Sequence, residues 1–510
     1  MNKFESLSRH FHIHRVVFFS SAFLILVFIA LGALFPEAMG TWTGRVQSWI
    51  ALQLGWYYIL LVGSLLPFAL WLGLGPFAEI KLGKDDDRPE FGVFTWFAML
   101  FSAGMGIGLL FFSVAEPVMH FTSPPPGGAT AEDGTAALAR QAMNVTFYHW
   151  GLHAWSIYIV VGLSLAYFHF RHDLPLSLRS ALYPLIGERI HGRIGDIVDI
   201  FAVVGTLFGV ATSLGLGAMQ VNSGLHRVIG ATEGIQTQLA IIAGITMVAT
   251  ISVVSGIGKG IRRLSELNVI SGLALMLFVL VAGPTVFILN GFVESIGIYL
   301  ERLPARSFWT NAQGSPAWMG SWTVFYWGWW IAWSPFVGMF IARISRGRTI
   351  RQFVLGVLIV PTLITFLWLS IFGQSALYQQ ITGGVDMAAV VSNSVPSALY
   401  ALLEQFPLAI LTSFFATIVV INFFVTSSDS GSLVIDIISA GGHPNPPTAQ
   451  RIFWAVLEGA VAAVLLVAGG LRALQTGSIT TSLPLSVFLI FLCYGLVKAL
   501  RQEKPREKKQ

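Results

Sequence analysis

A cluster of tryptophans lies in the middle of one apolar segment of this 510-residue chain. The segment reads WTVFYWGWWIAWSPF, and at 100° per residue one helix face carries, within about a 100° arc, Trp329, Trp330 and Trp333. A second apolar segment carries, within an arc of about 140°, Trp150, Trp155 and Tyr158. Two such faces turned toward each other would form an aromatic box, which binds a quaternary ammonium ion at about 0.5–2 kcal/mol per ring contact. Each cluster taken alone also fits ordinary core packing.

Three glycines alternate with larger residues in a further apolar segment, in the order Gly104-Met105-Gly106-Ile107-Gly108. Each glycine costs a helix about 1 kcal/mol relative to alanine, so this pattern needs a physical reason. One reason is close packing against a neighbouring helix. The other is an unwound stretch whose free carbonyls coordinate a substrate or cation at mid-membrane. No strand precedes the glycines, which excludes a dinucleotide-binding loop.

Asp429 lies in the polar run VTSSDSG inside another apolar segment. Hydroxyls beside free carbonyls are hard oxygen ligands, which a sodium ion prefers. The run is therefore a candidate for binding a coupling ion. The alternative is a hydrogen-bonded kink in a helix.

Three other ionisable residues lie in or near apolar segments. Glu116 precedes Pro117 where one segment ends, and we expect it near the outer surface. His149 and His153 are one helical turn apart and form either a proton relay or a hydrogen-bonded structural pair. No carboxylate or cysteine accompanies the two histidines at ligand spacing, so the pattern does not predict a metal centre.

The chain has no nucleophile elbow, P-loop, HExxH motif or paired cysteines. The sequence therefore does not predict an enzyme, a resident cofactor or an ATP-driven pump.

The elements that must position these residues are membrane-spanning helices. Hydrophobic residues make up 55% of the chain and charged residues only 11%, whereas soluble proteins carry about a quarter charged residues. Continuous apolar runs of about twenty residues indicate helices rather than barrel strands. We predict an all-α polytopic membrane protein with twelve spans near 17–36, 57–77, 92–115, 142–168, 197–221, 237–256, 267–290, 320–342, 352–377, 407–437, 451–470 and 480–500.

The distribution of positive charge predicts the orientation of these spans. Of the 30 Lys and Arg residues, 24 fall in the terminal segments and in alternate loops, and six fall in the other loops. The positive-inside rule then places both termini in the cytoplasm of a cell, with the chain in the plasma or inner membrane. Because the charges are scattered over short segments, they do not indicate nucleic-acid binding.

Two non-spanning segments have a predicted form. Residues 291–319 contain VESIGIYLERL, which suits either an amphipathic helix on the outer membrane surface or an ordinary connecting loop. Residues 501–510 form a short basic tail that could touch anionic membrane lipid.

From about Gly55 to Lys498 the chain resembles the betaine/carnitine/choline transporter family. The resemblance is most specific in AGMGIGLLFFSVAEP, in FYWGWWIAWSPFVGMFIARISRGRTIR and in FFVTSSDSG. It implies a LeuT-like fold, with one inverted repeat over residues 92–290 (spans three to seven) and another over residues 320–500 (spans eight to twelve). Residues 1–91 would hold the N-terminus and two peripheral spans. The family usually forms homotrimers, and its substrates serve in osmoprotection.

The resemblance also implies roles for individual residues. The family's aromatic box corresponds to Trp150, Trp155, Tyr158 and Trp330, with Trp329 and Trp333 beside it, and Gly104, Met105 and Gly106 meet the other end of the substrate. A sodium site would use Ser102, Met105, Phe423, Thr426 and Ser427. A second sodium site of betaine-type members corresponds to Thr206, Val210 and Phe336, and the valine lacks the required hydroxyl.

The expected function is import of a quaternary ammonium compound by secondary active symport. Segments such as SALYPLIGERI and SELNV resemble the choline branch, whereas Met105 resembles sodium-coupled members. Choline is therefore the first expected substrate and glycine betaine the second, and the driving ion is sodium or a proton. Carnitine or a sulfonium analogue, a sodium-independent exchanger, and a channel or receptor with the same aromatic cage are the alternatives.

Overall fold

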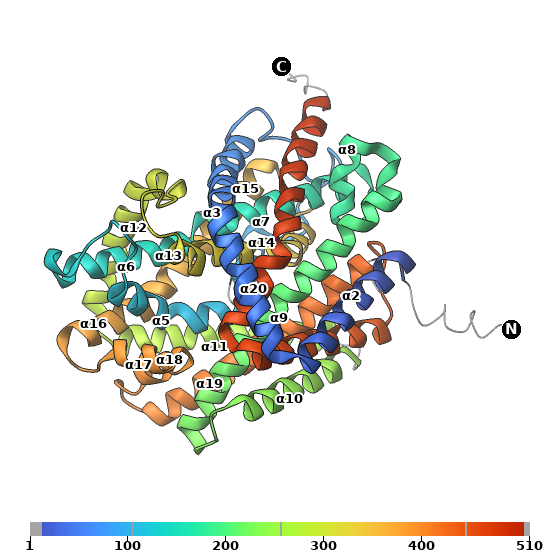
Figure 1. Cartoon of the computed structure of the whole chain (residues 1–510). Helices are drawn as coiled ribbons and strands as arrows, with labels where there is room; N and C mark the ends of the chain where they lie inside the picture. Colours follow the sequence, from blue (N-terminus) through green and yellow to red (C-terminus); the bar gives the residue numbers. More distant parts are fainter. Residues whose placement is uncertain (1–12, 105, 255–257, 444–445, 504–510) are drawn as a thin grey trace.

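The computed structural model describes residues 13–503 except 105, 255–257 and 444–445, and it describes side chains outside 101–105 and 252–265. The described residues form helices and no strand apart from an isolated bridge between Lys81 and Thr349. The prediction of an all-helical chain is confirmed (Figure 1).

The helices of the first half are α2 (Arg15–Leu34), α3 (Pro36–Leu74), α4 (Val93–Gly104), α5 (Ile107–Thr122), α6 (Thr135–Trp150), α7 (Leu152–Ala166), α8 (Tyr183–Ile186), α9 (Arg193–Ile229) and α10 (Ile235–Val254). Those of the second half are α11 (Gly258–Ala282), α12 (Thr285–Ser307), α13 (Ala317–Ser321), α14 (Thr323–Arg343), α15 (Ile350–Leu369), α16 (Ser375–Thr382), α17 (Met387–Asn393), α18 (Ala398–Leu403), α19 (Ala409–Ser439) and α20 (Thr448–Gln502).

Seven of the described helices are long and apolar enough to cross a membrane, or eight if a bent pair counts as one span. The bent pair is Glu266–Ala282 and Thr285–Ser307, which meet at 111°. The 55-residue α20 contains a break at Gly469 and Gly470, and it covers the last two predicted spans. The polytopic prediction is thus confirmed, and the number twelve stays a prediction.

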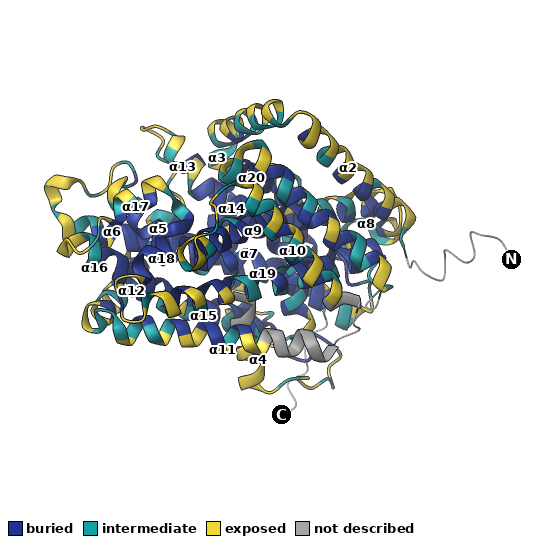
Figure 2. Cartoon of the chain, turned by 90° about the horizontal axis from the view of Figure 1, so that it is seen from below, coloured by how far each residue is buried: buried dark blue, intermediate teal, exposed yellow. Residues whose placement is uncertain are grey.

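The centre of the molecule is formed by α7, α9 and α14. Every residue of α7 from His153 to Ala166 is buried, and the tryptophan-rich α14 is buried over nearly its whole length. Figure 2 shows these helices in dark blue, enclosed by helices with exposed outer faces. Exposed apolar side chains on α2, α10 and α11, among them Phe23, Met247 and Val281, suit contact with lipid.

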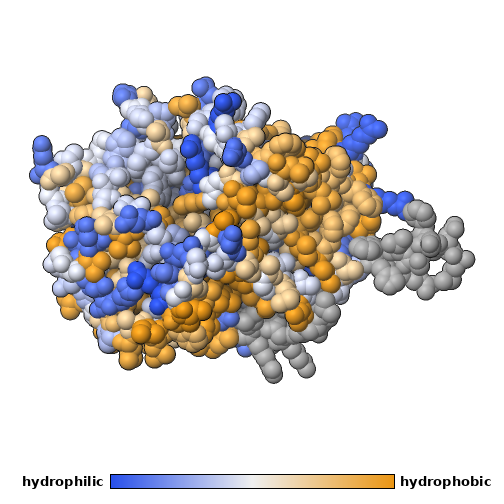
Figure 3. All heavy atoms as spheres, turned by 60° about the horizontal axis from the view of Figure 1, so that its bottom comes forward, coloured by the Kyte–Doolittle hydropathy of each residue, from blue (hydrophilic) through white to orange (hydrophobic). Residues whose placement is uncertain are grey.

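Broad hydrophobic areas cover much of the face seen in Figure 3. On a soluble protein, contiguous apolar patches of this kind are rare. The surface therefore agrees with a membrane location.

The helix over the alternating glycines is interrupted where the sequence suggested. Helix α4 ends at Gly104 and α5 begins at Ile107, and Gly106 between them is extended, with φ −149° and ψ 172°. A side chain at Gly108 would also collide with a ring, because its Cβ would lie 2.4 Å from Trp329 Cη2. Both reasons considered for the glycines, unwinding and close packing, therefore apply to different residues of the motif.

Segments that the charge count assigned to one side meet in the structure. Arg171 Nε lies 2.6 Å from Glu503 Oε1, and Lys84 Nζ lies 2.6 Å from Asp173 Oδ2. Arg346, in a third segment, pairs with Asp87 at 3.2 Å. The loops after the second, fourth and eighth predicted spans therefore lie on one face of the molecule, together with the end of α20.

The segment after the predicted seventh span is helical as far as Ser307, which fits the amphipathic-helix interpretation of its first part. Helix α20 continues to Gln502, inside the segment predicted as a tail, and Glu503 is paired with Arg171.

Candidate functional site

Six aromatic side chains from three helices surround one small cavity. None of them is more than 9% exposed. They come from the end of α6, from α7 and from α14, and are Trp150, Trp155, Tyr158, Trp329, Trp330 and Trp333. The structure therefore brings together the two aromatic faces that the sequence placed on separate segments.

The rings of this aromatic box meet mostly at steep angles. Trp150 and Trp330 have ring centroids 4.9 Å apart at 67°, and Tyr158 lies 6.5 Å from Trp330 at 73°. Trp155 and Tyr158 are 5.4 Å apart at 77°. Trp329 instead stacks on Trp330 at 4.8 Å and 13°. Steeply inclined rings present several π-faces to one point, which is the geometry that favours a cation.

The cavity at the centre of the box has a volume of about 40 Å³. That is space for a few waters, so a trimethylammonium group requires the rings to move apart. Gly106, Gly108 and Leu109, at and after the break between α4 and α5, line the same cavity. The aromatic box and the interrupted helix thus form one site.

The indole N–H groups of three box residues are already bonded to other parts of the protein. Trp150 Nε1 donates to Glu116 Oε2 at 2.8 Å, and Trp330 Nε1 donates to the carbonyl of His149 at 2.9 Å. Trp329 Nε1 donates to the carbonyl of Gly209 on α9 at 3.4 Å. These bonds fix the orientation of the three indoles. Trp329 stacks on Trp330 and also on Phe325, so its role is to support Trp330 at the wall of the box.

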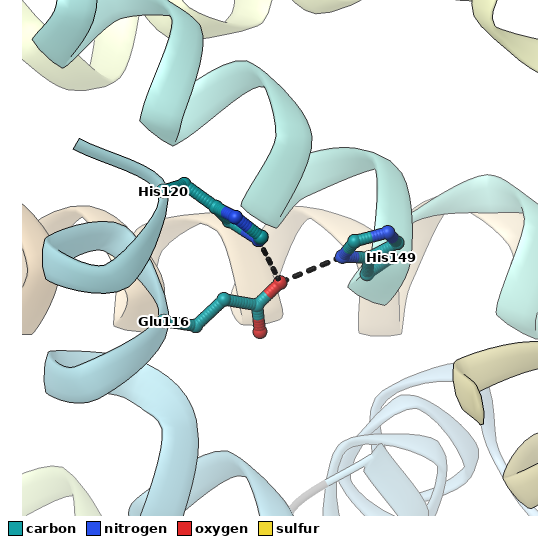
Figure 4. A group of neighbouring side chains, drawn as sticks. All are labelled: Glu116, His120 and His149. Carbon is teal, nitrogen blue, oxygen red and sulfur yellow. Dashed lines mark hydrogen bonds and ion pairs between the residues drawn. The ribbon is translucent and has the colours of Figure 1, made fainter. Parts of the chain in front are cut away.

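Glu116 is a buried carboxylate that hydrogen-bonds a residue of the box, Trp150. Its Oε1 lies 2.7 Å from His149 Nδ1 and 3.2 Å from His120 Nε2, as Figure 4 shows. Its Oε2 accepts from Trp150 and, at 2.5 Å, from the Tyr326 hydroxyl. The Glu116 side chain is fully buried within α5, which continues to Thr122, and its position near the outer membrane surface stays a prediction. Four partners compensate the loss of water around this carboxylate.

The two histidines of α6 and α7 have separate partners. His149 bonds Glu116 and, through Nε2, the hydroxyl of Thr323 at 3.1 Å, whereas His153 Nε2 bonds Ser307 at 2.9 Å. They are therefore not the hydrogen-bonded pair that the sequence suggested. A carboxylate does accompany His149, because the fold brings Glu116 and His120 from α5 to it, with ligand atoms within 4.8 Å of one another. Sequence spacing within one helix could not reveal a contact between helices.

The predicted ion ligands are only partly described. Met105 and the side chain of Ser102 lie outside the described residues. Thr426 and Ser427 are half-buried on α19, one turn after the buried Phe423. Asn268 of α11, which the sequence reasoning missed, donates from Nδ2 to Thr426 Oγ1 at 2.7 Å. An amide group therefore lies directly beside the predicted sodium ligands.

Of the residues predicted for the second ion site, Thr206 supplies a hydroxyl group, and its side chain is buried. Thr206 is fully buried and its Oγ1 has no hydrogen-bond partner among the described residues. Val210, one turn later on α9, is also buried and apolar. Phe336 packs against Trp333, with ring centroids 5.4 Å apart.

Asp429 lies in an uninterrupted part of α19 and is paired with a cation. Its Oδ1 accepts from Arg451 Nη2 at 2.7 Å, and its main-chain carbonyl accepts from the same nitrogen at 3.1 Å. This ion pair was not anticipated, since Arg451 is 22 residues away.

The comparisons with known proteins agree on one family of transporters. A profile described as betaine/carnitine/choline family transporter matches residues 16–505. An uncharacterized transporter of Mycobacterium tuberculosis is 48% identical over 96% of this chain and 82% of its own length.

Two further relatives carry names with different substrates. A glycine betaine transporter of Acinetobacter baylyi is 44% identical over 98% of this chain and 75% of its own length. A high-affinity choline transport protein of Escherichia coli is 45% identical over 97% of this chain and 73% of its own length. The relatives are transporters rather than enzymes, and they do not single out one substrate.

Proposed function

This chain belongs to the betaine/carnitine/choline transporter family, and from that premise we propose that it is a secondary active symporter that imports a quaternary ammonium compound. Choline is the first substrate we propose and glycine betaine the second. The observation that carries this proposal is the convergence of six buried aromatic rings on one cavity beside an interrupted helix.

In this proposal the box binds the trimethylammonium group. Such a cation has no N–H to donate, so ring faces replace water at about 0.5–2 kcal/mol per contact. Three or four contacts then supply several kcal/mol, which suits micromolar to millimolar binding after the cost of immobilising the substrate.

The break between α4 and α5 receives the other end of the substrate. Gly104, Met105 and Gly106 supply main-chain groups there, and the first N–H groups of α5 face the break, because α5 begins at Ile107. The N–H groups of a helix N-terminus favour a carboxylate, as in glycine betaine, and they can also donate to the hydroxyl oxygen of choline. The balance between these two end groups decides the substrate preference.

We propose one coupling ion, sodium or a proton, and no other cofactor. Sodium would be bound by Ser102, Met105, Phe423, Thr426 and Ser427. Support comes from the position of Thr426 and Ser427 on α19, and from Val210, which removes a ligand from a second site with Thr206 and Phe336. A sodium-independent exchanger with a fixed cation is less favoured, because residues 267–290 contain no Lys or Arg.

The proposed architecture follows the family. It has twelve membrane helices with two inverted repeats over residues 92–290 and 320–500, and both termini in the cytoplasm. The protein would form a homotrimer in the cell membrane and contribute to osmoprotection. The contacts among Lys84, Asp173, Arg171 and Glu503 support a common side for the positive segments.

A competition experiment tests the substrate. Purified protein in liposomes exchanges internal unlabelled choline for external labelled choline, and glycine betaine, carnitine and dimethylsulfonium analogues compete. Choline should compete best and glycine betaine next. If none of these compounds competes or exchanges, the proposed function is wrong. A channel with the same cage would conduct choline without accumulating it.

A further inference from the structure

Glu458 is a carboxyl group within a predicted membrane span, and no ion pair of its own is found among the described side chains. It lies in α20, within the predicted span 451–470, and its side chain is fully buried. Its Oε2 accepts from the Ser428 hydroxyl at 3.4 Å, and its Oε1 has no hydrogen-bond partner among the described residues. Ionisable groups inside membrane spans are costly, and they mark ion or proton pathways.

Among the described side chains, the guanidinium near Glu458 is that of Arg451, and it is already engaged by another carboxylate. Arg451, two helical turns before Glu458, donates to the side chain and the main chain of Asp429. Asp436, also buried, faces the same arginine. Counted over the described side chains, ionisation of Asp429, Asp436 and Glu458 against Arg451 would leave two negative charges uncompensated in an apolar interior.

A proton fits this position better than a metal ion. Sodium needs several oxygen ligands, whereas the described polar partner of Glu458 is the Ser428 hydroxyl, and its Oε1 has no hydrogen-bond partner among the described residues. The α10 helix adds Thr246 beside the adjacent Gly459. A buried carboxyl group with a single described hydrogen bond is neutralised most simply by protonation.

Glu458 is also connected to the aromatic box through α9. A Cβ built on Gly431 of α19 would lie 2.8 Å from Val210 and 3.3 Å from Glu458 Oε1, so these groups gather at one point. Gly209, the residue before Val210, receives the Trp329 N–H, and a Cβ there would lie 2.7 Å from Trp333. One turn of α9 therefore contacts the box through Gly209 and, through Val210, packs against the glycine of α19 that also borders the carboxyl group.

We propose that Glu458 is the proton-carrying residue of this transporter, an inference that rests on the proposed symport. The carboxylate accepts a proton from hydronium when the site is open to the outside, leaving water and a neutral acid. When the site opens to the cytoplasm, the acid returns the proton to water. Ser428 hydrogen-bonds Glu458, and the adjacent Asp429 pairs with Arg451 near the N-terminal end of α20, where Arg451 is 15% exposed.

The experiment uses full-length protein in liposomes with the membrane potential clamped at zero. Choline exchange at equal pH on both sides measures binding and conformational change without net proton movement. Choline accumulation driven by one pH unit, acidic outside, measures coupling and reaches about tenfold for one proton per choline. An internal pH dye records the proton that accompanies each choline.

We expect Glu458→Gln to retain exchange within about threefold of the unmodified protein and to lose accumulation, with the concentration ratio falling from about tenfold to one. Glu458→Asp should restore part of the accumulation, because it restores an ionisable group. Glu404→Gln is the matched control, since Glu404 forms a half-exposed pair with Arg227 far along the chain, and it should behave like the unmodified protein.

Three results would overturn the assignment. The first is normal pH-driven accumulation by Glu458→Gln. The second is accumulation by the unmodified protein under a sodium gradient with no proton movement, which would leave the proposed symport intact. The third is loss of exchange in both Glu458→Gln and Glu458→Asp, which would indicate a packing role. If the unmodified protein exchanges none of the quaternary ammonium compounds, the proposed function itself fails.

Discussion

Trp150 Nε1 lies 2.8 Å from Glu116 Oε2, so a wall of the aromatic box is held by a buried carboxylate from a different helix. Glu116 also bonds Tyr326 and both His120 and His149. The orientation of the box therefore depends on a polar group that does not line the cavity. We regard Glu116 as a positioning residue for the substrate site.

Replacing Glu116 with Gln should weaken substrate binding more than turnover. The Glu116 carboxylate faces four hydrogen-bonding groups. Glutamine replaces one carboxylate oxygen with an NH2 group, which is itself a donor. At least one of these groups then loses its acceptor, at a cost of about 1–3 kcal/mol. We expect KM for choline to rise about 5- to 100-fold, with a smaller change in the maximal rate. Uptake kinetics in cells, normalised to protein in the membrane, measure this. An unchanged KM would contradict the positioning role.

Trp330→Ala should abolish most uptake while leaving the protein folded in the membrane. Trp330 contacts Trp150, Tyr158 and Trp329 and faces the cavity, so its loss removes a wall of the box and about 0.5–2 kcal/mol of cation–π attraction. Trp56→Ala is the matched control, because Trp56 is 59% exposed. Normal choline and betaine uptake by Trp330→Ala would show that the box is wrongly assigned.

Gly108→Ala should impair transport through steric conflict with the box. The added Cβ would lie 2.4 Å from Trp329 and 3.1 Å from Trp150, so at least one ring must shift. Gly244→Ala in α10 meets nothing within 4 Å and should transport normally, with a helix gain of about 1 kcal/mol at most. Substrate affinity measured by tryptophan fluorescence compares the two variants. Equal affinities would indicate that the cavity tolerates the shift.

The ion pair at the end of α20 predicts a pH-dependent stability. Hydrogen bonds from Arg171 hold the pKa of the Glu503 carboxyl below its ordinary value. The pair therefore stabilises the folded protein above the ordinary carboxyl pKa of about 4.3, and this stabilisation is lost as the pH falls through the lower folded pKa.

Glu503→Gln should consequently lower the melting temperature in detergent at pH 7, and this difference should shrink at pH values below about 4. The effect corresponds to about 1 kcal/mol or less, because both side chains touch solvent. Glu132→Gln, at an exposed position of the loop before α6, is the control. A difference that stays constant from pH 7 to acidic pH would contradict this account.

The sequence predicted those features that depend on periodicity along one helix. The arcs of Trp329, Trp330 and Trp333 and of Trp150, Trp155 and Tyr158 follow from 100° per residue, and the structure turns the two faces toward each other. The glycine motif left open both an unwound stretch and close helix packing, and the structure has a break between α4 and α5 at this motif.

Contacts between helices could not be predicted in this way. The donors around Glu116 come from α5, α6 and α14, and a glutamate before proline in the sequence did not indicate any of them. Asn268 beside Thr426 and Glu458 beside Ser428 are contacts across 158 and 30 residues. Such pairs arise from packing, for which a single sequence carries no local signal.

The central claim is that this protein accumulates a quaternary ammonium compound against its gradient. The most direct measurement is uptake of radiolabelled choline, and then of glycine betaine, by purified protein in liposomes under an inward sodium gradient and separately under an inward proton gradient. The account predicts accumulation above equilibrium under at least one gradient, and loss of that accumulation in Trp330→Ala. Equilibration of both compounds without accumulation under either gradient would contradict it.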